Sequence, residues 1–184
     1  MSLAGKKFLL IINPASGTVS KHRIVPRLYR KMLRMAVDFD IAFSRGPGHV
    51  HELAAEAAEK SYYGVIACGG DGTVNEAATG LIGTATALGI VPTGSGNGLA
   101  RHIGIPIDID LSLKIIAENN IINADYGTAN GVPFFCTFGV GFDAAVSERC
   151  ARENRRGALM YLKNSFTEYI KFHPEEYQIR VGNQ

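Results

Sequence analysis

Short apolar runs alternate along the first 120 residues with segments in which apolar residues recur at helical spacing. The runs predict four strands, at residues 8–13, 38–43, 64–68 and 86–91. The segments between and after them predict helices at residues 20–36, 49–60, 73–82 and 99–102, and one that begins at Asp108 or Asp110 and ends near Asn119. This repetition predicts an α/β domain in which helices cover both faces of a parallel sheet.

A different pattern begins at residue 121. The dipeptide Asn130-Gly131, a strong hairpin signal, separates two strand-like segments at residues 121–129 and 132–138. A helical pattern at residues 157–172 and a strand from Tyr177 to Val181 follow. We therefore expect a three-layer α/β domain over residues 4–120 and the start of an antiparallel β-sandwich domain over residues 121–184. Because the last predicted strand has no visible partner, we expect this second domain to be truncated.

Each predicted strand of the first domain ends in a polar or glycine-rich loop. The four loops lie at residues 13–17, 44–48, 69–72 and 92–98. The carboxyl ends of parallel strands meet at one edge of a sheet, which is where ligands of such proteins bind. We therefore expect the four loops to converge on one rim and to form a binding site there.

Composition limits the classes of protein that remain. With 184 residues, 46% of them hydrophobic, the chain can bury one substantial core. The sequence contains no apolar run near the roughly 20 residues that span a bilayer, and no apolar leader at its start. Its three cysteines, Cys68, Cys136 and Cys150, are odd in number and widely spaced, which favours reduced thiols. These features predict a soluble cytoplasmic protein.

Charge is distributed unevenly along the chain. The net charge is +2, but the first 37 residues contain eight Lys or Arg and no acidic residue. Most of these basic residues lie in the predicted helix at residues 20–36, on a side that its apolar residues do not occupy. Such a cationic face is most often a solvated surface. The sharper hypothesis is that it lies against anionic lipid.

The strongest local signal is the stretch at residues 68–78, which reads C-G-G-D-G-T-V-N-E-A-A. It predicts a strand, a tight glycine loop and a helix, an arrangement in which backbone N–H groups can bind a phosphate. We expect Thr73 to cap the helix and Glu76 to complete a capping box. Asp71 would repel an anion unless a metal ion or a reacting hydroxyl lies between them. The loop therefore predicts binding of nucleotide phosphates together with a divalent cation.

Two common nucleotide-binding templates do not match. The P-loop pattern G-x-x-x-x-G-K-[ST] is absent, and the first strand is followed by N-P-A-S-G rather than by G-x-G-x-x-G. A partial match to the second template, Gly94-Ser95-Gly96-Asn97-Gly98, follows the fourth strand and lacks the final spacing.

Three motifs together are more specific than any one of them. Asn13-Pro14-x-Ser16-Gly17, the G-G-D-G-T-x-N-E loop and Pro92-x-Gly94-Ser95-Gly96-Asn97 occur in the order and spacing of the diacylglycerol kinase catalytic-domain family, which the chain resembles. That family includes bacterial lipid kinases, sphingosine kinases and ceramide kinases. It shares the G-G-D-G-T loop with NAD kinases and phosphofructokinases.

The resemblance implies an ATP-dependent lipid kinase that transfers the γ-phosphoryl group to a hydroxyl of diacylglycerol or a related lipid, with Mg²⁺ as the metal. It implies a lipid substrate at a membrane surface, peripheral membrane association and no nucleic acid partner, and it leaves a homodimer open. The resemblance assigns catalysis to Asp71 and metal binding to Asp71 and Asp125. The implied nucleotide contacts are Asn13, Ser16, Ser44, Gly69, Gly70, Asp71, Gly72, Thr73, Val74, Asn75, Ser95 and Asn97.

The sequence departs from the family pattern at two points. Gly98 stands where many bacterial relatives have Asp, and the family's Asp-Gly-Glu motif, which supplies the proposed catalytic base, lies beyond residue 184. Activity of the fragment is therefore left open. A NAD kinase-like enzyme and a nucleotide-binding module without catalysis also remain as alternatives. Simpler structural roles stay open for three residues: helix capping for Ser44 and Ser95, and a turn for Asp125.

Overall fold

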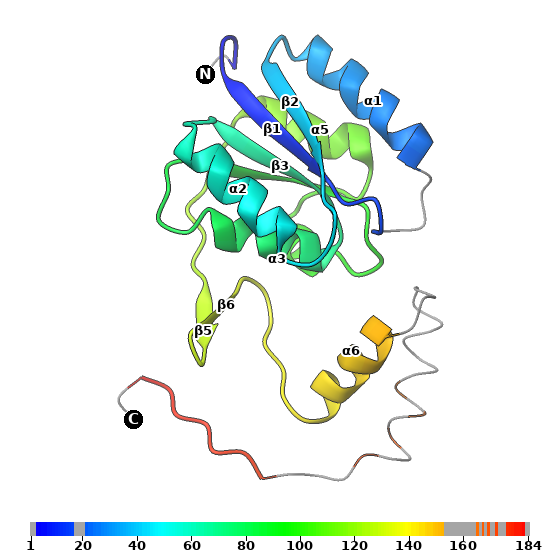
Figure 1. Ribbon diagram of the computed structural model, residues 1–184, viewed down its shortest axis with the longest axis vertical. Coiled ribbons are helices and arrows are strands. Elements are labelled where there is room, and N and C mark those ends of the chain that lie inside the picture. The colour runs from blue at the N-terminus through cyan, green and yellow to red at the C-terminus, as the bar shows by residue number, and fades with distance from the viewer. Residues whose placement is uncertain are drawn as a thin grey trace. The chain divides into compact units, whose positions relative to one another are not determined.

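The computed structural model describes residues 3–16, 21–152 and 176–182, together with Ser165, Thr167, Tyr169 and Phe172. The chain separates into two compact units, residues 1–137 and residues 138–184. The first unit contains the sheet and most of the helices (Figure 1).

A parallel sheet of four strands forms the centre of the first unit. Its strands are β1 (Lys7–Ile12), β2 (Asp38–Phe43), β3 (Gly64–Gly69) and β4 (Ala87–Pro92), in the spatial order β2-β1-β3-β4. All three strand pairs are parallel. The two inner strands are continuous apolar runs because both of their faces are covered, which is typical of parallel sheets. The predicted α/β fold is thus confirmed.

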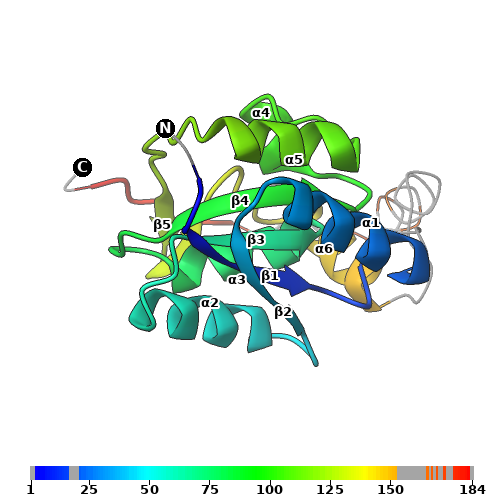
Figure 2. The same cartoon turned by 90° about the horizontal axis from the view of Figure 1, so that it is seen from above.

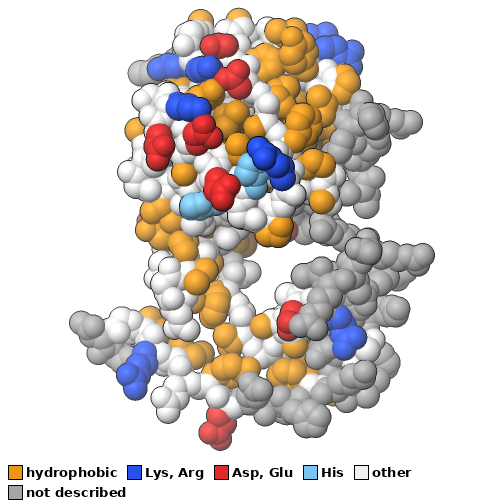
Figure 3. Space-filling model, viewed as in Figure 1, with side chains coloured by type: hydrophobic (Ala, Val, Ile, Leu, Met, Phe, Trp, Pro, Cys, Tyr) orange, Lys and Arg blue, Asp and Glu red, His pale blue; other side chains and the backbone are white. Residues whose placement is uncertain are grey.

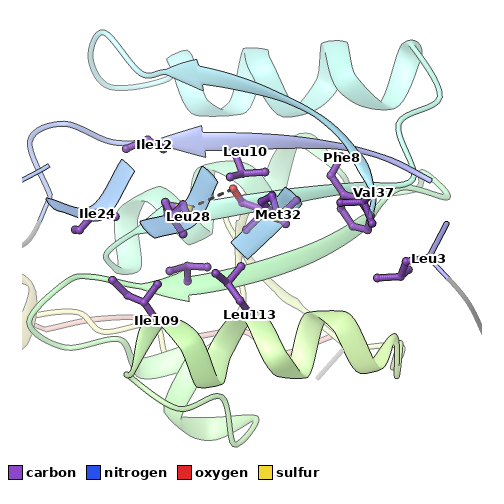
Figure 4. Close-up of a cluster of buried hydrophobic side chains, with 13 residues drawn as sticks. Leu3, Phe8, Leu10, Ile12, Ile24, Leu28, Met32, Val37, Ile109 and Leu113 are labelled. Carbon is purple, nitrogen blue, oxygen red and sulfur yellow. Dashed lines mark hydrogen bonds between the residues drawn. The ribbon is translucent and has the colours of Figure 1, made fainter. Parts of the chain in front are cut away.

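Helices cover the two faces of the sheet in pairs. The helices α1 (Lys21–Arg34) and α5 (Ile109–Glu118) lie over one face, and α2 (His49–Glu59) and α3 (Asp71–Gly80) lie over the other (Figure 2). The short helix α4 (Gly98–His102) follows β4. Successive side chains of a strand point to opposite faces. Leu10 therefore packs with Leu28 and Leu113 in one core cluster (Figure 4), and Leu9 packs with Val50 and Ala54 in the other.

The predicted hairpin is present. The strands β5 (Gly127–Ala129) and β6 (Val132–Phe134) pair in antiparallel fashion around Asn130 and Gly131. Both turn residues have positive φ, 49° and 80°, the conformation that the Asn-Gly pair favours. The structure groups this hairpin with the first unit. The predicted domain division at residue 121 stays a prediction.

The second unit differs most from expectation. It contains α6 (Phe142–Arg152), a helix that the sequence did not lead us to expect. Residues 177–181, predicted as a strand, have no regular secondary structure, so that prediction was wrong. The predicted helix at residues 157–172 falls largely outside the described residues. In the part of the chain that the structure describes, none of the helices has the length and apolar character needed to cross a bilayer.

Candidate functional site

The order of the strands places a topological switch point at the carboxyl ends of β1 and β3. From β1 the chain runs outward to β2 and then returns to the other side of β1 to form β3, so the connections diverge between β1 and β3. Ligands of open α/β sheets bind at such a switch point. Asn13 follows β1 there, and its backbone N–H donates to the carbonyl of Cys68 in β3 at 3.1 Å.

Hydrogen bonds join the loops after β1, β3 and β4. The Asn13 side chain accepts from the N–H of Ala15 at 2.9 Å and donates through Nδ2 to Thr73 Oγ1 at 2.9 Å. Ser16 Oγ donates to the Asn13 carbonyl at 3.0 Å and lies 3.3 Å from Thr93 Oγ1. The Thr93 N–H in turn donates to the carbonyl of Gly69 at 2.8 Å. Three of the four predicted loops are therefore held together by their own polar groups.

The start of α3 is not closed by a side chain. Gly70 is its N-cap residue and makes no capping hydrogen bond. The predicted capping box was wrong, because its two side chains have other partners. Thr73 Oγ1 accepts from Asn13, and Glu76 Oε2 accepts from the N–H of Val50 in α2 at 3.2 Å.

An anion can approach this helix start. Gly72, in the first turn, is exposed, and a Cβ built on it would meet no atom within 4 Å. A helix N-terminus carries unpaired N–H groups and a partial positive charge, so the first turn of α3 is suited to bind a phosphate.

Asp71 has backbone partners that the sequence analysis did not foresee. Its carboxylate accepts from the N–H of Asn97 through Oδ2 at 2.8 Å and from the N–H of Gly98 through Oδ1 at 2.5 Å. Gly98 is the first residue of α4, so Asp71 closes the start of that helix from outside. No local signal predicts this contact, because Asn97, at the N-cap position of α4, is itself a residue that often caps helices. The carboxylate remains exposed and has lone pairs for a further ligand.

The loop after β4 is itself tightly ordered. Asn97 adopts left-handed backbone geometry with φ 55°, and its amide bonds twice to Gly94, accepting from the N–H at 3.0 Å and donating to the carbonyl at 2.8 Å. A Cβ on Gly94 would overlap the Cα of Gly70. Gly94 therefore has to be glycine, because its loop touches the loop of Gly70 backbone to backbone.

Other predicted site residues occupy varied positions. Ser44 is buried at the end of β2, where its N–H donates to the carbonyl of Ile12 at 3.0 Å, and Ser95 is exposed on the loop after β4. Val74 packs into the core and its N–H donates to the carbonyl of Gly70 at 3.1 Å, and Asn75 is half-buried in α3. Thr93, buried between Ser16 and Gly69, was missed by the sequence analysis, although it lies within the third motif.

The metal prediction rests on carboxylates that do not form a cluster. Asp125 is exposed in the segment that precedes β5. Among the described residues no group of three or more His, Cys, Asp or Glu could by itself hold a metal ion. Mg²⁺ is commonly bound by one or two carboxylates together with substrate phosphates, so the oxygen ligands of Asp71 and Asp125 suit it in type. Their assignment as metal ligands stays a prediction.

Comparison with known proteins identifies the family to which this chain belongs. The sequence profile of the diacylglycerol kinase catalytic domain matches residues 7–129, which include all four parallel strands and the loops after them. The chain belongs to this family. The resemblance inferred from the three motifs is thus confirmed.

Individual members of the diacylglycerol kinase family agree with the match. A probable lipid kinase YegS-like protein of Cronobacter sakazakii is 36% identical over 145 residues, covering 77% of this chain and 47% of that protein. The diacylglycerol kinase of Staphylococcus saprophyticus is 31% identical over 127 residues, covering 68% and 42%. A crystal structure of a diacylglycerol kinase from Bacillus anthracis is 30% identical with a TM-score of 0.65, covering 70% and 45%.

The match extends over only part of these proteins. The chain spans between 38% and 60% of the length of curated relatives that it matches. The family is one of lipid kinases, and the portion present here contains the sheet, its four loops and the α3 helix start.

Proposed function

We propose that the rim of loops binds ATP with Mg²⁺ and that the chain is the nucleotide-binding part of an ATP-dependent lipid kinase. The observation that carries this proposal is the uncapped start of α3 at the sheet's switch point. The loops beside it are joined by the Asn13–Thr73 and Ser16–Thr93 contacts. A polyphosphate needs a preformed anion site of this kind, because binding energy is lost if the loops must first be ordered.

Each predicted contact has a role in this proposal. The N–H groups of Gly70, Asp71, Gly72 and Thr73 lack partners within the helix and would bind phosphate oxygens. Asn13, Ser16 and Ser95 are the neighbouring polar groups, and Ser44 lies at the end of the adjoining strand. Asn97 keeps the loop after β4 in the shape that brings Ser95 to the rim. Positioning and charge neutralisation provide most of the catalysis in phosphoryl transfer, so an arrangement of backbone donors suits the reaction.

Asp71 would act where the phosphate chain ends. We assign it to Mg²⁺ binding or to orientation of the accepting hydroxyl, with Asp125 as a second carboxylate for the metal. Bound Mg²⁺ would neutralise charge on the phosphate oxygens. The N–H groups of Asn97 and Gly98 donate to the Asp71 carboxylate and restrict its rotamer. The carboxylate is therefore already positioned before a ligand arrives.

The acceptor is proposed to be a hydroxyl of diacylglycerol or a related lipid, met by a peripheral cytoplasmic enzyme at a membrane surface. Support comes from relatives that are named diacylglycerol kinase and probable lipid kinase. The γ-phosphoryl group would pass from ATP to the lipid oxygen, and the proton of the hydroxyl would leave to a base.

Calorimetry tests the nucleotide part of the proposal. We expect the 184-residue chain to bind ATP saturably with Mg²⁺ and more weakly without it. The exposed-surface variant Lys60→Gln should bind ATP equally well. Absence of saturable ATP binding by a folded chain would refute the proposal.

A transfer assay with labelled γ-phosphate tests the acceptor. It offers vesicle-borne diacylglycerol and NAD side by side, and label on NAD rather than on lipid would contradict the lipid assignment.

A further inference from the structure

The helix α1 has an outward face without acidic residues. Ile24, Leu28 and Met32 are at most 2% exposed and face the sheet. At 100° per residue, the opposite side of the helix carries Arg30, Leu33 and Arg34, all exposed. The sequence of α1 from residue 21 to residue 34 contains six Lys or Arg and neither Asp nor Glu.

Bulky apolar side chains accompany these charges. Leu33 is 56% exposed, and Tyr29, one turn earlier, is 48% exposed while its ring packs edge-on against Phe39 of β2. In Figure 3, hydrophobic side chains gather over the region where Figure 1 labels α1 and β2, with basic side chains beside them. Single exposed apolar residues are ordinary. Helices that lie on membranes combine apolar side chains with Lys or Arg, and the outward face of α1 presents both kinds.

Ion pairs among the described residues do not neutralise the arginines of the outward face. Arg27, on the flank, is paired with Asp110 of α5 at 2.6 Å and with Asp108 at 3.4 Å. Asp110 also attracts Lys31 and Arg34 at longer range. Arg30 donates through Nε to the carbonyl of Pro26 in its own helix, which leaves its charge uncompensated. In the described part of the chain no carboxylate forms an ion pair with Arg30 or Arg34.

We propose that the outward face of α1, formed by Tyr29, Arg30, Leu33 and Arg34, docks on an anionic membrane. Leu33 and Tyr29 would enter the headgroup region, while the two arginines would contact lipid phosphates around them. The inference rests on the proposed function only in that the lipid acceptor lies in a membrane. The contact itself needs neither nucleotide nor transfer.

Vesicle sedimentation of the 184-residue chain without nucleotide tests the proposal. Vesicles are made of phosphatidylcholine alone or of phosphatidylcholine mixed with phosphatidylglycerol. The double variant Arg30→Gln, Arg34→Gln should bind the anionic vesicles roughly 30-fold more weakly than wild type, since each basic residue near such a surface contributes about 1 kcal/mol. The matched control Lys6→Gln, Lys60→Gln removes two exposed charges from elsewhere and should bind as wild type does.

A second variant separates apolar from charge contributions. Leu33→Ser should weaken binding to both kinds of vesicle, by about tenfold for the anionic ones. Added salt should weaken anionic binding of wild type and leave the Arg30→Gln, Arg34→Gln variant nearly unaffected. Equal binding of wild type to both vesicles, or wild-type binding by the double arginine variant, would overturn the proposal. So would binding to a DNA duplex that the same arginine variant abolishes, because the face would then be a nucleic-acid surface.

This outcome can be distinguished from failure of the proposed function. Loss of ATP binding by a chain that still sediments with anionic vesicles would count against the nucleotide site alone. The double arginine variant should bind ATP with Mg²⁺ as wild type does, because neither arginine belongs to the rim of loops.

Discussion

The starts of α3 and α5 differ in whether a side chain accepts from their unpaired backbone N–H groups. The first N–H groups of any helix lack partners within it. At α5, the Asp108 carboxylate accepts from the N–H groups of Asp110 and Leu111 at 2.8 and 3.0 Å. At α3, the corresponding residue is Gly70, and no side chain in the described chain caps the helix.

The capped start of α5 contributes to stability, whereas the uncapped start of α3 leaves N–H groups available to a ligand. A capping side chain is worth about 1 kcal/mol relative to a residue that cannot cap. The helix α5, which lies over the sheet, has this contribution, whereas α3 lacks it at the point where the sheet's connections diverge. The helix α4 provides a third case, because Asp71, the first residue of α3, accepts from N–H groups at its start. A helix start left open among closed ones is a reason to place the ligand there.

Closing the start of α3 with charge should have the largest effect. Gly72→Asp places a carboxylate in the space where a phosphate would bind, and it meets no steric obstacle in the protein. We expect ATP affinity to fall on the order of 100-fold, because like charges a few ångströms apart repel strongly near a protein surface. Gly72→Asn is the matched control of equal size, and calorimetry should show a much smaller loss. Equal losses in the two variants would point to bulk rather than charge.

Removing the carboxylate that links α3 to α4 should have the next largest effect. In Asp71→Asn only one amide oxygen remains to accept the N–H groups of Asn97 and Gly98. We expect the free energy of unfolding to fall by about 1–2 kcal/mol and ATP affinity with Mg²⁺ to fall about tenfold. Chemical denaturation and calorimetry measure the two quantities. Asp38→Asn, an exposed change on β2, serves as control, and unchanged handling of ATP and Mg²⁺ by Asp71→Asn would exclude it from the site.

Opening the start of α5 should affect stability alone. Asp108→Ala removes the cap, and we expect a loss of about 1 kcal/mol, or a Tm lower by about 2–4 °C. Asp108→Asn retains a side-chain oxygen for capping and should be much less destabilised in the same thermal scan. ATP affinity should be unaltered in both variants. A weaker nucleotide affinity in Asp108→Ala would show that the two helix starts are not independent.

The smallest expected effect is a pH dependence at α5. Arg27 donates to Asp110 and lowers the pKa of that carboxyl below its ordinary value of 3.8. A lowered folded-state pKa means that this stabilisation is present above about pH 4 and is lost as pH falls through the folded-state value. The groups are exposed, so we expect only a few tenths of a kcal/mol.

Denaturation of wild type and Asp110→Asn across this acidic range measures the effect. Their difference in unfolding free energy should shrink as pH falls. Glu118→Gln, a change in the same helix, is the control. A constant difference between wild type and Asp110→Asn would contradict the assignment of the stabilisation to the Arg27–Asp110 pair.

Local patterns predicted the sheet and its loops well. Continuous apolar runs marked β1 and β3 because both faces of those strands are buried, and Asn130-Gly131 marked the hairpin because that turn requires positive φ. The convergence of the loops followed from the parallel arrangement alone. The strands and the hairpin turn depend on residues that are neighbours in the sequence, so a local pattern can predict them.

Side-chain partners at the site were less predictable because they lie far apart in the sequence. Thr73 was expected to cap its own helix, but it accepts from Asn13, 60 residues away, and Glu76 accepts from Val50, 26 residues away. The contact between Asp71 and the start of α4 has the same character. In residues 138–184, α6 was not foreseen and the strand at 177–181 was wrongly expected, since short segments of mixed polarity suit either state.

The Ser16–Thr93 contact, between residues 77 positions apart, has a consequence for biosynthesis. A ribosome-bound chain that has not yet released β4 cannot make this contact or the Asp71 contact with Asn97 and Gly98. If the rim binds ATP as proposed, nucleotide binding would require the fourth strand to be complete, and ATP present during translation should protect from proteolysis only those nascent chains that have passed this length.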